Sequence, residues 1–121
     1  MRFPHAPAVA VDVLDRYGLA DLTMRRLGAE LGVQPSALYH HFANKQSLLA
    51  AVADEILARS TWPAAGPWEE RATGICTVLR DSLLAYRDGA EVVATVWSFG
   101  LGAAHPYGAL VDALDEAGLG E

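Results

Sequence analysis

Apolar side chains recur every three or four residues along most of the chain, which is the spacing of one face of an α-helix. No alternation of apolar and polar residues, which would indicate a strand, appears anywhere in the sequence. The sequence therefore predicts an all-α protein. Its helices are expected at about residues 7–17, 23–31, 35–41, 45–60, 67–87, 92–101 and 106–117.

The segment from Leu22 to Phe42 has the pattern of two short helices joined by a tight turn. Thr23 is a favourable N-cap, because its hydroxyl can accept from a free amide of the first turn. Gly32 stands where a left-handed glycine commonly ends a helix. Pro35 suits the first position of the next helix, and Gly28 allows the two helices to cross closely. The segment is predicted to be a helix-turn-helix.

The second of these helices is predicted to have two distinct faces. Leu38 and Phe42 point toward the core, whereas small and hydrogen-bonding side chains point outward. Such a helix can enter the major groove of DNA with its first turn against the base edges. Asn44 is expected to cap a further helix that begins at Lys45, and a helix N-terminus with a lysine is a phosphate site.

Two segments carry a resemblance to a known family. LTMRRLGAELGV (22–33) and SALYHHFANKQSLLAAVADEI (36–56) resemble the DNA-binding domain of the TetR-type repressors, and the match extends over about residues 8–60. LLAYRDGAEV (83–92) resembles, more weakly, the effector domain of the tetracycline-repressor branch. The resemblance implies a three-helix DNA-binding domain with a helix-turn-helix, linked by a long helix to the start of a helical ligand-binding and dimerisation domain.

On this basis we expect a DNA-binding domain at residues 1–60, with residues 45–60 as the linking helix. A partial effector-binding and dimerisation domain is expected at residues 61–121. The segment TWPAAGP (61–67) marks the boundary by its prolines and glycine. Members of the family use further C-terminal helices to close the effector pocket and to form a homodimer. The chain is therefore expected to be either a fragment or a short relative, and both alternatives remain open.

The helix-turn-helix and the resemblance together indicate a set of DNA contacts. Arg25 is expected to read a base, and Tyr39 to pack on the backbone and donate to a phosphate. Each could instead be an ordinary helix charge or a half-buried core side chain. His40 and His41 diverge by about 100° on a helix, so a close metal-binding pair is not expected. The full set of expected contacts is Thr23, Arg25, Pro35, Ser36, Ala37, Tyr39, His40, His41 and Lys45.

The charge is unevenly distributed along the chain, which has a net charge of −6. Residues 1–60 hold six Lys or Arg and six Asp or Glu, whereas residues 61–121 hold three Arg and nine acidic residues. Between Thr23 and Lys45 the balance is three positive charges to one negative. The helix-turn-helix is thus the relatively basic part, as DNA binding requires. An ordinary acidic protein could show the same net charge.

The same resemblance implies an effector pocket of unusual chemistry. Aligned on RDGA (87–90), Val93 falls where the tetracycline branch has the histidine that ligates drug-bound magnesium. Ile75 and Leu79 fall on an asparagine and a phenylalanine that touch the drug, and Thr61 falls on another histidine. Aliphatic side chains cannot ligate a hard cation, so no response to tetracycline is expected. We expect an apolar or aromatic effector instead, contacted by Thr61, Ile75, Leu79, Val93, Val96 and Trp97.

Several features narrow the remaining possibilities. No apolar run is long enough for a membrane span, and no signal peptide is evident, which favours a cytoplasmic protein. The single cysteine, Cys76, is expected to be a core thiol. The segment 92–101 is nearly all apolar, which predicts that it is buried on all sides or lines a cavity. Phosphate loops, metal-ligand spacings and nucleophile elbows are lacking, so neither an enzyme nor a cofactor or metal is expected.

These observations favour a ligand-responsive transcriptional regulator that acts as a repressor. It is expected to bind a near-palindromic double-stranded DNA operator, as a homodimer when full length, and to be released by a small-molecule effector. Two alternatives remain open. One is a constitutive DNA-binding module without an effector, and the other is a helical interaction protein whose helix-turn-helix is only a scaffold.

Overall fold

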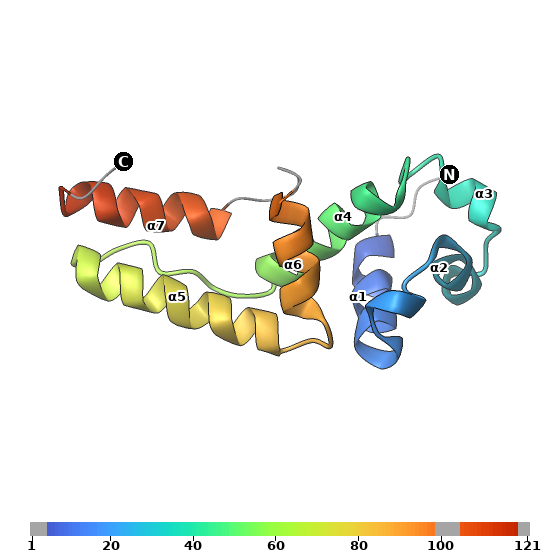
Figure 1. The fold of residues 1–121 in the computed structure, drawn as a ribbon, viewed down its shortest axis with the longest axis horizontal. Coiled ribbons are helices and arrows are strands. Elements are labelled where there is room, and N and C mark those ends of the chain that lie inside the picture. The colour runs from blue at the N-terminus through green and yellow to red at the C-terminus, as the bar shows by residue number, and fades with distance from the viewer. Residues whose placement is uncertain (1–4, 99–104, 119–121) are drawn as a thin grey trace.

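The structure is a computed structural model that describes residues 5–98 and 105–118. Every regular element in these two ranges is a helix, which confirms the predicted all-α class (Figure 1). The predicted helical residues 99–101 lie outside the described ranges. The elements are α1 (Ala6–Tyr17), the short 3-10 helix η1 (Leu19–Asp21), α2 (Met24–Leu31), α3 (Pro35–Leu38), α4 (Lys45–Ala58), α5 (Trp68–Leu84), α6 (Gly89–Ser98) and α7 (His105–Glu116).

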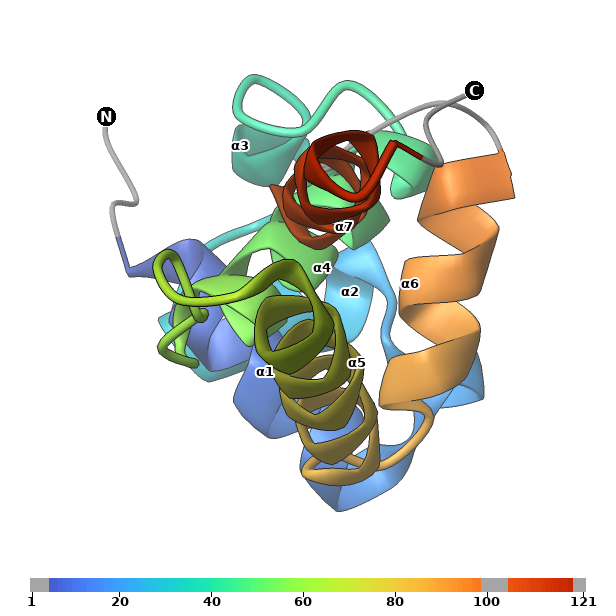
Figure 2. The ribbon, with the colours of Figure 1, turned by 90° about the vertical axis from the view of Figure 1, so that its left-hand side faces the viewer.

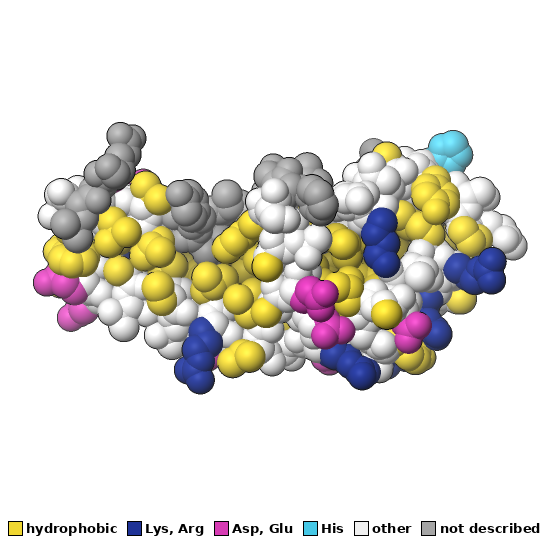
Figure 3. All heavy atoms as spheres, in the orientation of Figure 1, with side chains coloured by type: hydrophobic (Ala, Val, Ile, Leu, Met, Phe, Trp, Pro, Cys, Tyr) yellow, Lys and Arg dark blue, Asp and Glu magenta, His cyan; other side chains and the backbone are white. Residues whose placement is uncertain are grey.

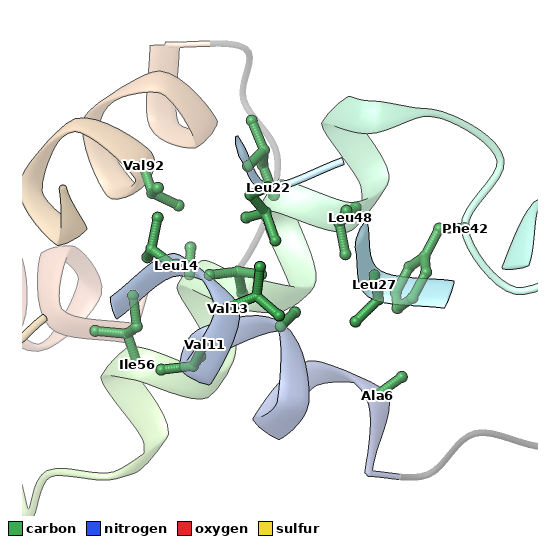
Figure 4. Packing of buried hydrophobic residues seen from close by; sticks show 14 of the residues in the cluster. Ala6, Val11, Val13, Leu14, Leu22, Leu27, Phe42, Leu48, Ile56 and Val92 are labelled. Atoms are coloured by element: carbon green, nitrogen blue, oxygen red, sulfur yellow. The ribbon is translucent and has the colours of Figure 1, made fainter. Parts of the chain in front are cut away.

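Helices α1 to α4 enclose the main hydrophobic core. Leu14 of α1, Leu27 of α2 and Leu48 of α4 have no exposed surface, and their side chains converge between these helices (Figure 4). Burying one such leucine contributes roughly 1.5–3 kcal/mol to folding. These helices and η1, residues 5–58, are called the head from here on.

The predicted helix-turn-helix is present, with its predicted caps. The Thr23 hydroxyl accepts from the Arg26 backbone N–H at 3.1 Å, and Gly32 has a φ of 74° in the left-handed region. A Cβ on Gly28 would lie 2.7 Å from the carbonyl oxygen of Val33, so only glycine permits this tight turn. Helix α3 begins at Pro35 as predicted.

Helix α3 is shorter than the sequence predicted. It ends at Leu38, and Tyr39 to His41 form a turn in place of a further helical turn. The backbone N–H groups of His41 and Phe42 both donate to the Leu38 carbonyl, at 2.9 and 2.7 Å. The turn brings the Phe42 side chain back into the core, where it is 4% exposed.

Helix α4 lies in the middle of the molecule and packs against α1 on one side and α6 on the other (Figures 1 and 2). Helices α5 and α7 lie side by side at the end opposite the helix-turn-helix. These two helices are called the outer layer. None of the described helices is both long and apolar enough to cross a membrane.

Two predictions about burial are wrong. Cys76 is exposed on α5, not a core thiol. Helix α6 is not buried on all sides, because Val92, Val93 and Val96 face the core while Ala94 faces solvent. Apolar composition alone did not show that only one face of α6 meets α4 and α5.

Backbone and side-chain hydrogen bonds fasten the turn between α5 and α6 to the head. The Leu19 N–H donates to the Asp88 carboxylate at 2.8 Å, and the Arg87 N–H donates to Asp15 Oδ1 at 3.0 Å. Arg87 Nη1 also donates to the carbonyl of Arg16 at 3.3 Å. Asp88 holds a φ of 57°, which is uncommon for a residue other than glycine. This turn is therefore a specific junction between the head and the rest of the chain.

Candidate DNA-binding surface and effector site

The two adjacent arginines of α2 have different environments. Arg25 is exposed and has no ion-pair or hydrogen-bond partner among the described residues. The guanidinium of Arg26 lies 4.1 Å from the centre of the Tyr17 ring, a cation–π distance. Arg16 lies over the same ring at 5.1 Å and pairs with Glu30 at 3.1 Å. Arg26 thus helps to join α1 to α2, and Arg25 remains available for DNA.

The predicted contact residues of α3 and the following turn are at least partly accessible. Ser36, His40 and His41 are exposed, and the Tyr39 side chain is 53% exposed. The His41 ring stands edge-on to Phe42, with 4.6 Å between the ring centres. Pro35 and Ala37 are half-buried, and Ala37 packs partly against the core.

The start of α4 forms a further part of this surface. Asn44 Oδ1 accepts from the Ser47 N–H at 2.8 Å, which confirms the predicted cap. Lys45, the first residue of the helix, is half-buried and has no anionic partner among the described side chains. The positive end of the helix dipole and the Lys45 ammonium together favour a phosphate.

All the predicted DNA contacts lie on elements at one end of the molecule. Helices α2 and α3, the turn after α3 and the start of α4 meet there, away from the outer layer (Figure 1). In Figure 3 most of the visible Lys and Arg side chains lie over this half, together with some Asp, Glu and hydrophobic side chains. The surface is therefore an accessible, relatively basic helix end of the kind that fits a DNA groove.

Most predicted effector contacts are packed into the interior. Ile75, Val93 and Val96 are fully buried, and Leu79 and Trp97 are half-buried against the core. They pack between helices of the described part of the chain, and none of them lines the hollows described below. The resemblance selected these positions, and it did not show how closely the helices pack around them.

Thr61 lies apart from those residues, beside a hollow of about 300 Å³ between the end of α4 and α5. The hydroxyls of Ser60 and Ser82 are hydrogen-bonded there at 2.6 Å. Arg59 donates to Glu55 at 2.8 Å and to the Tyr86 hydroxyl at 3.3 Å. The hydrogen bonds to Tyr86 and then Glu55 raise the pKa of the Arg59 guanidinium above its ordinary value. This hollow has a mixed lining, in which the polar side chains of Arg59, Ser60, Ser82 and Tyr86 are hydrogen-bonded to other residues.

A larger hollow, about 600 Å³, lies between the loop 61–67, α5 and α7. Sequence reasoning did not identify its lining. A usable signal was present, because Ala109, Asp112 and Glu116 are spaced i, i+3 and i+7 and so share one face of α7. Among the described residues, no cluster of three or more His, Cys, Asp or Glu side chains could hold a metal ion.

Comparisons with known proteins agree with this arrangement. Residues 8–52 match the family described as bacterial regulatory proteins, tetR family. Residues 62–121 match the tetracyclin repressor-like C-terminal domain. The tetracycline repressor protein class A from transposon 1721 of Escherichia coli is 44% identical over 89 residues, which are 70% of this chain and 41% of that protein. The chain thus spans about two fifths of the length of the curated repressors that it matches.

Solved structures extend the similarity over the whole chain. The crystal structure of Mycobacterium smegmatis BioQ is 44% identical and has a TM-score of 0.90, covering 100% of this chain and 68% of that one. A structure of BioQ with its natural double-stranded DNA operator is 44% identical with a TM-score of 0.88, covering 98% and 73% of the two chains. With both halves matched and the helix-turn-helix in place, the chain belongs to the TetR family of bacterial regulatory proteins.

Proposed function

We propose that this chain contains the DNA-reading head and part of the effector domain of a ligand-responsive transcriptional repressor. The observation that carries the proposal is the capped helix-turn-helix, whose predicted contact residues are all at least partly accessible at one end of the molecule. The similarity to BioQ, for which a structure with a DNA operator exists, supports a double-stranded DNA partner. A cytoplasmic location belongs to the same proposal.

The proposed mechanism depends on a homodimer of the full-length protein. Two heads about 34–36 Å apart can occupy successive major grooves of a near-palindromic operator only at one separation. An effector that binds better to another separation shifts the population off DNA. Helix α4 is placed to transmit the change, because it packs against α1 in the head and against α6. We propose residues 1–60 as the DNA-binding domain and 61–121 as part of the effector domain.

The proposed effector is a small molecule with an apolar or aromatic body, and not tetracycline. Val93, Ile75 and Leu79 replace the polar and aromatic drug contacts of the tetracycline branch, and a buried drug oxygen without a partner costs about 1–3 kcal/mol. Thr61 and the inward-facing Val96 and Trp97 complete the proposed set. Small rearrangements of the packed helices would be needed to admit a ligand among these side chains.

The first experiment tests the reading surface. DNA fragments that bind the protein are selected from a random pool and sequenced, and the affinity for the recovered sequence is measured by fluorescence anisotropy. We expect Arg25→Ala to weaken binding by about 1–3 kcal/mol and to relax the preference at one base position. Arg26→Ala is the matched control, because Arg26 is stacked on Tyr17 and should leave the preferred sequence unchanged. Unaltered affinity and sequence preference in Arg25→Ala would place the reading surface elsewhere.

The second experiment tests the phosphate site at the start of α4. Lys45→Ala should weaken binding to all DNA sequences alike, because a phosphate contact carries no base information. The slope of log affinity against log salt should decrease by about one unit. The control is Gln46→Ala, an exposed neutral neighbour that should not change the slope. An unchanged slope in Lys45→Ala would exclude this phosphate contact.

A further inference from the structure

The hollow between the loop 61–67, α5 and α7, here called the α7 cavity, has a lining of mixed chemistry. Its volume is about 600 Å³, within the range of small-molecule sites. The loop contributes aromatic and apolar side chains, and α5 and α7 contribute charged ones. The lining residues are Trp62, Pro63, Ala64, Arg71, Ala109, Asp112 and Glu116.

Among the described residues of this lining, the only cation is Arg71, and it is already paired. Arg71 forms an ion pair with Glu116 and donates to the carbonyl of Gly66 at 2.9 Å. Its side chain is only 13% exposed, so these two contacts use most of its accessible charge. Arg71 thus ties α7 and the loop to α5. An anionic ligand would have to compete with Glu116 for this guanidinium.

Asp112 gives the cavity an excess of negative charge. Its carboxylate is exposed and has no ion-pair partner among the described residues. One arginine against two carboxylates leaves a net charge of −1 in the lining. The surrounding half of the chain adds to the effect, because residues 61–121 carry the entire −6 of the protein. A concave acidic site raises the local concentration of cations.

Trp62 supplies a fixed aromatic surface beside these carboxylates. Its indole N–H donates to the Leu57 carbonyl at 2.9 Å, which anchors the side chain to the end of α4. A cation held near the face of a tryptophan is stabilised by the ring quadrupole. Pro63, Ala64 and Ala109 provide apolar surface for the body of a ligand. The lining therefore offers negative charge for a cationic group beside apolar surface for a hydrocarbon group.

We infer that the α7 cavity binds an organic cation, a protonated amine or quaternary ammonium carried on an apolar or aromatic body. Asp112 faces the positive charge, Trp62 and the neighbouring apolar residues hold the body, and the Arg71–Glu116 pair fixes the walls. This site shares no residue with the effector contacts proposed above, so the inference goes beyond the proposed function and adds a second ligand site. Because Trp62 is bonded to the last turn of α4, an occupant of the cavity touches the helix that leads to the head.

The test uses nuclear magnetic resonance on the 121-residue chain labelled with ¹⁵N. Benzyltrimethylammonium is the cationic probe, N,N-dimethylbenzamide is a neutral probe of similar size, and benzenesulfonate is the anionic probe. We expect a saturable shift of the Trp62 indole N–H signal with the cation, larger than those of Trp68 and Trp97. The neutral and anionic probes should bind at least fivefold more weakly.

Two variants of α7 distinguish binding in the α7 cavity from a general attraction of the cation to the acidic surface. Asp112→Asn should raise the dissociation constant for the cation about fivefold, the effect of losing one partly exposed ion pair. Asp115→Asn removes the same charge from an exposed residue of the same helix that does not line the cavity, and should change the constant less than twofold. Circular dichroism of both variants checks that α7 remains folded.

Three results would overturn the inference: equal binding of the neutral or anionic probe, equal losses in the two variants, or no saturable shift of the Trp62 signal. DNA binding is measured on the same samples. A protein that binds DNA but not the cation loses only this inference. A protein that binds the cation but no DNA loses the proposed regulatory function and keeps the cation site.

Discussion

The head and the outer layer are built from similar helices but are packed very differently. Helix α4 of the head buries six of its 14 residues, whereas α5 of the outer layer, although longer at 17 residues, buries two. Leu84 on α5 is 69% exposed, and hydrophobic side chains remain visible along this layer (Figure 3). The difference shows that the head has a well-packed core of its own. The outer layer keeps accessible surface and hollows suited to a ligand.

Two kinds of contact join α6 and the turn before it to the head. Helix α6 packs its valine face on α4 through apolar contacts. The Asp15–Arg87 and Leu19–Asp88 hydrogen bonds then fix the turn before α6 to the end of α1. Apolar packing tolerates small shifts, but hydrogen bonds of this kind depend on distance and direction. In the proposed mechanism, this junction is where a movement of the effector domain would reach the head.

The largest expected effect tests the difference in packing directly. Leu27→Ala should destabilise the protein by about 2–5 kcal/mol, because it opens a cavity at a side chain with no exposed surface. Leu84→Ala, the same change at an exposed site, should alter stability by less than about 0.5 kcal/mol. Urea unfolding followed by circular dichroism measures both. Similar losses in the two variants would contradict the contrast between head and outer layer.

A second, smaller effect compares one glycine in each region. Gly28→Ala places a Cβ 2.7 Å from the Val33 carbonyl oxygen, a backbone atom that cannot rotate away. The strain of about 1–3 kcal/mol should outweigh the gain of about 1 kcal/mol in helix propensity. Gly108→Ala on α7 has no atom within 4 Å of its new Cβ and should be neutral or stabilising. The melting temperatures of the two variants, measured by thermal unfolding, should therefore change with opposite sign or by clearly different amounts.

The smallest expected effect concerns the junction. Asp15→Ala removes the acceptor of the Arg87 N–H and should cost about 0.5–1.5 kcal/mol. Asp15→Asn keeps a carbonyl acceptor and should cost less. The rate of hydrogen exchange at the Arg87 amide measures the effect locally. This rate should increase in the alanine variant. If exchange there is equal in all three proteins, Asp15 does not hold the turn.

Local sequence signals predicted the head with good accuracy. Caps, the turn glycine and the start of α3 depend on bonds within a few residues, so Thr23, Asn44, Gly32 and Pro35 could be interpreted without knowledge of the fold. The predicted DNA contacts could be placed on one end of the molecule for the same reason, since they lie on one compact motif; their role in DNA binding stays a prediction. The different roles of Arg25 and Arg26 could not be predicted, because Tyr17 reaches Arg26 from another helix.

The effector region was predicted less well, since its properties depend on contacts between distant segments. The sequence alone determined the helical class, the helix-turn-helix, the inward face of α5 and the location of negative charge in residues 61–121. Only the tertiary structure decided that Cys76 is exposed, that α6 turns only its valine face inward, and that the loop 61–67, α5 and α7 enclose the α7 cavity. The physical reason is that periodicity identifies which face of a helix is apolar, whereas the distance between two helices decides whether that face is packed or lines a cavity.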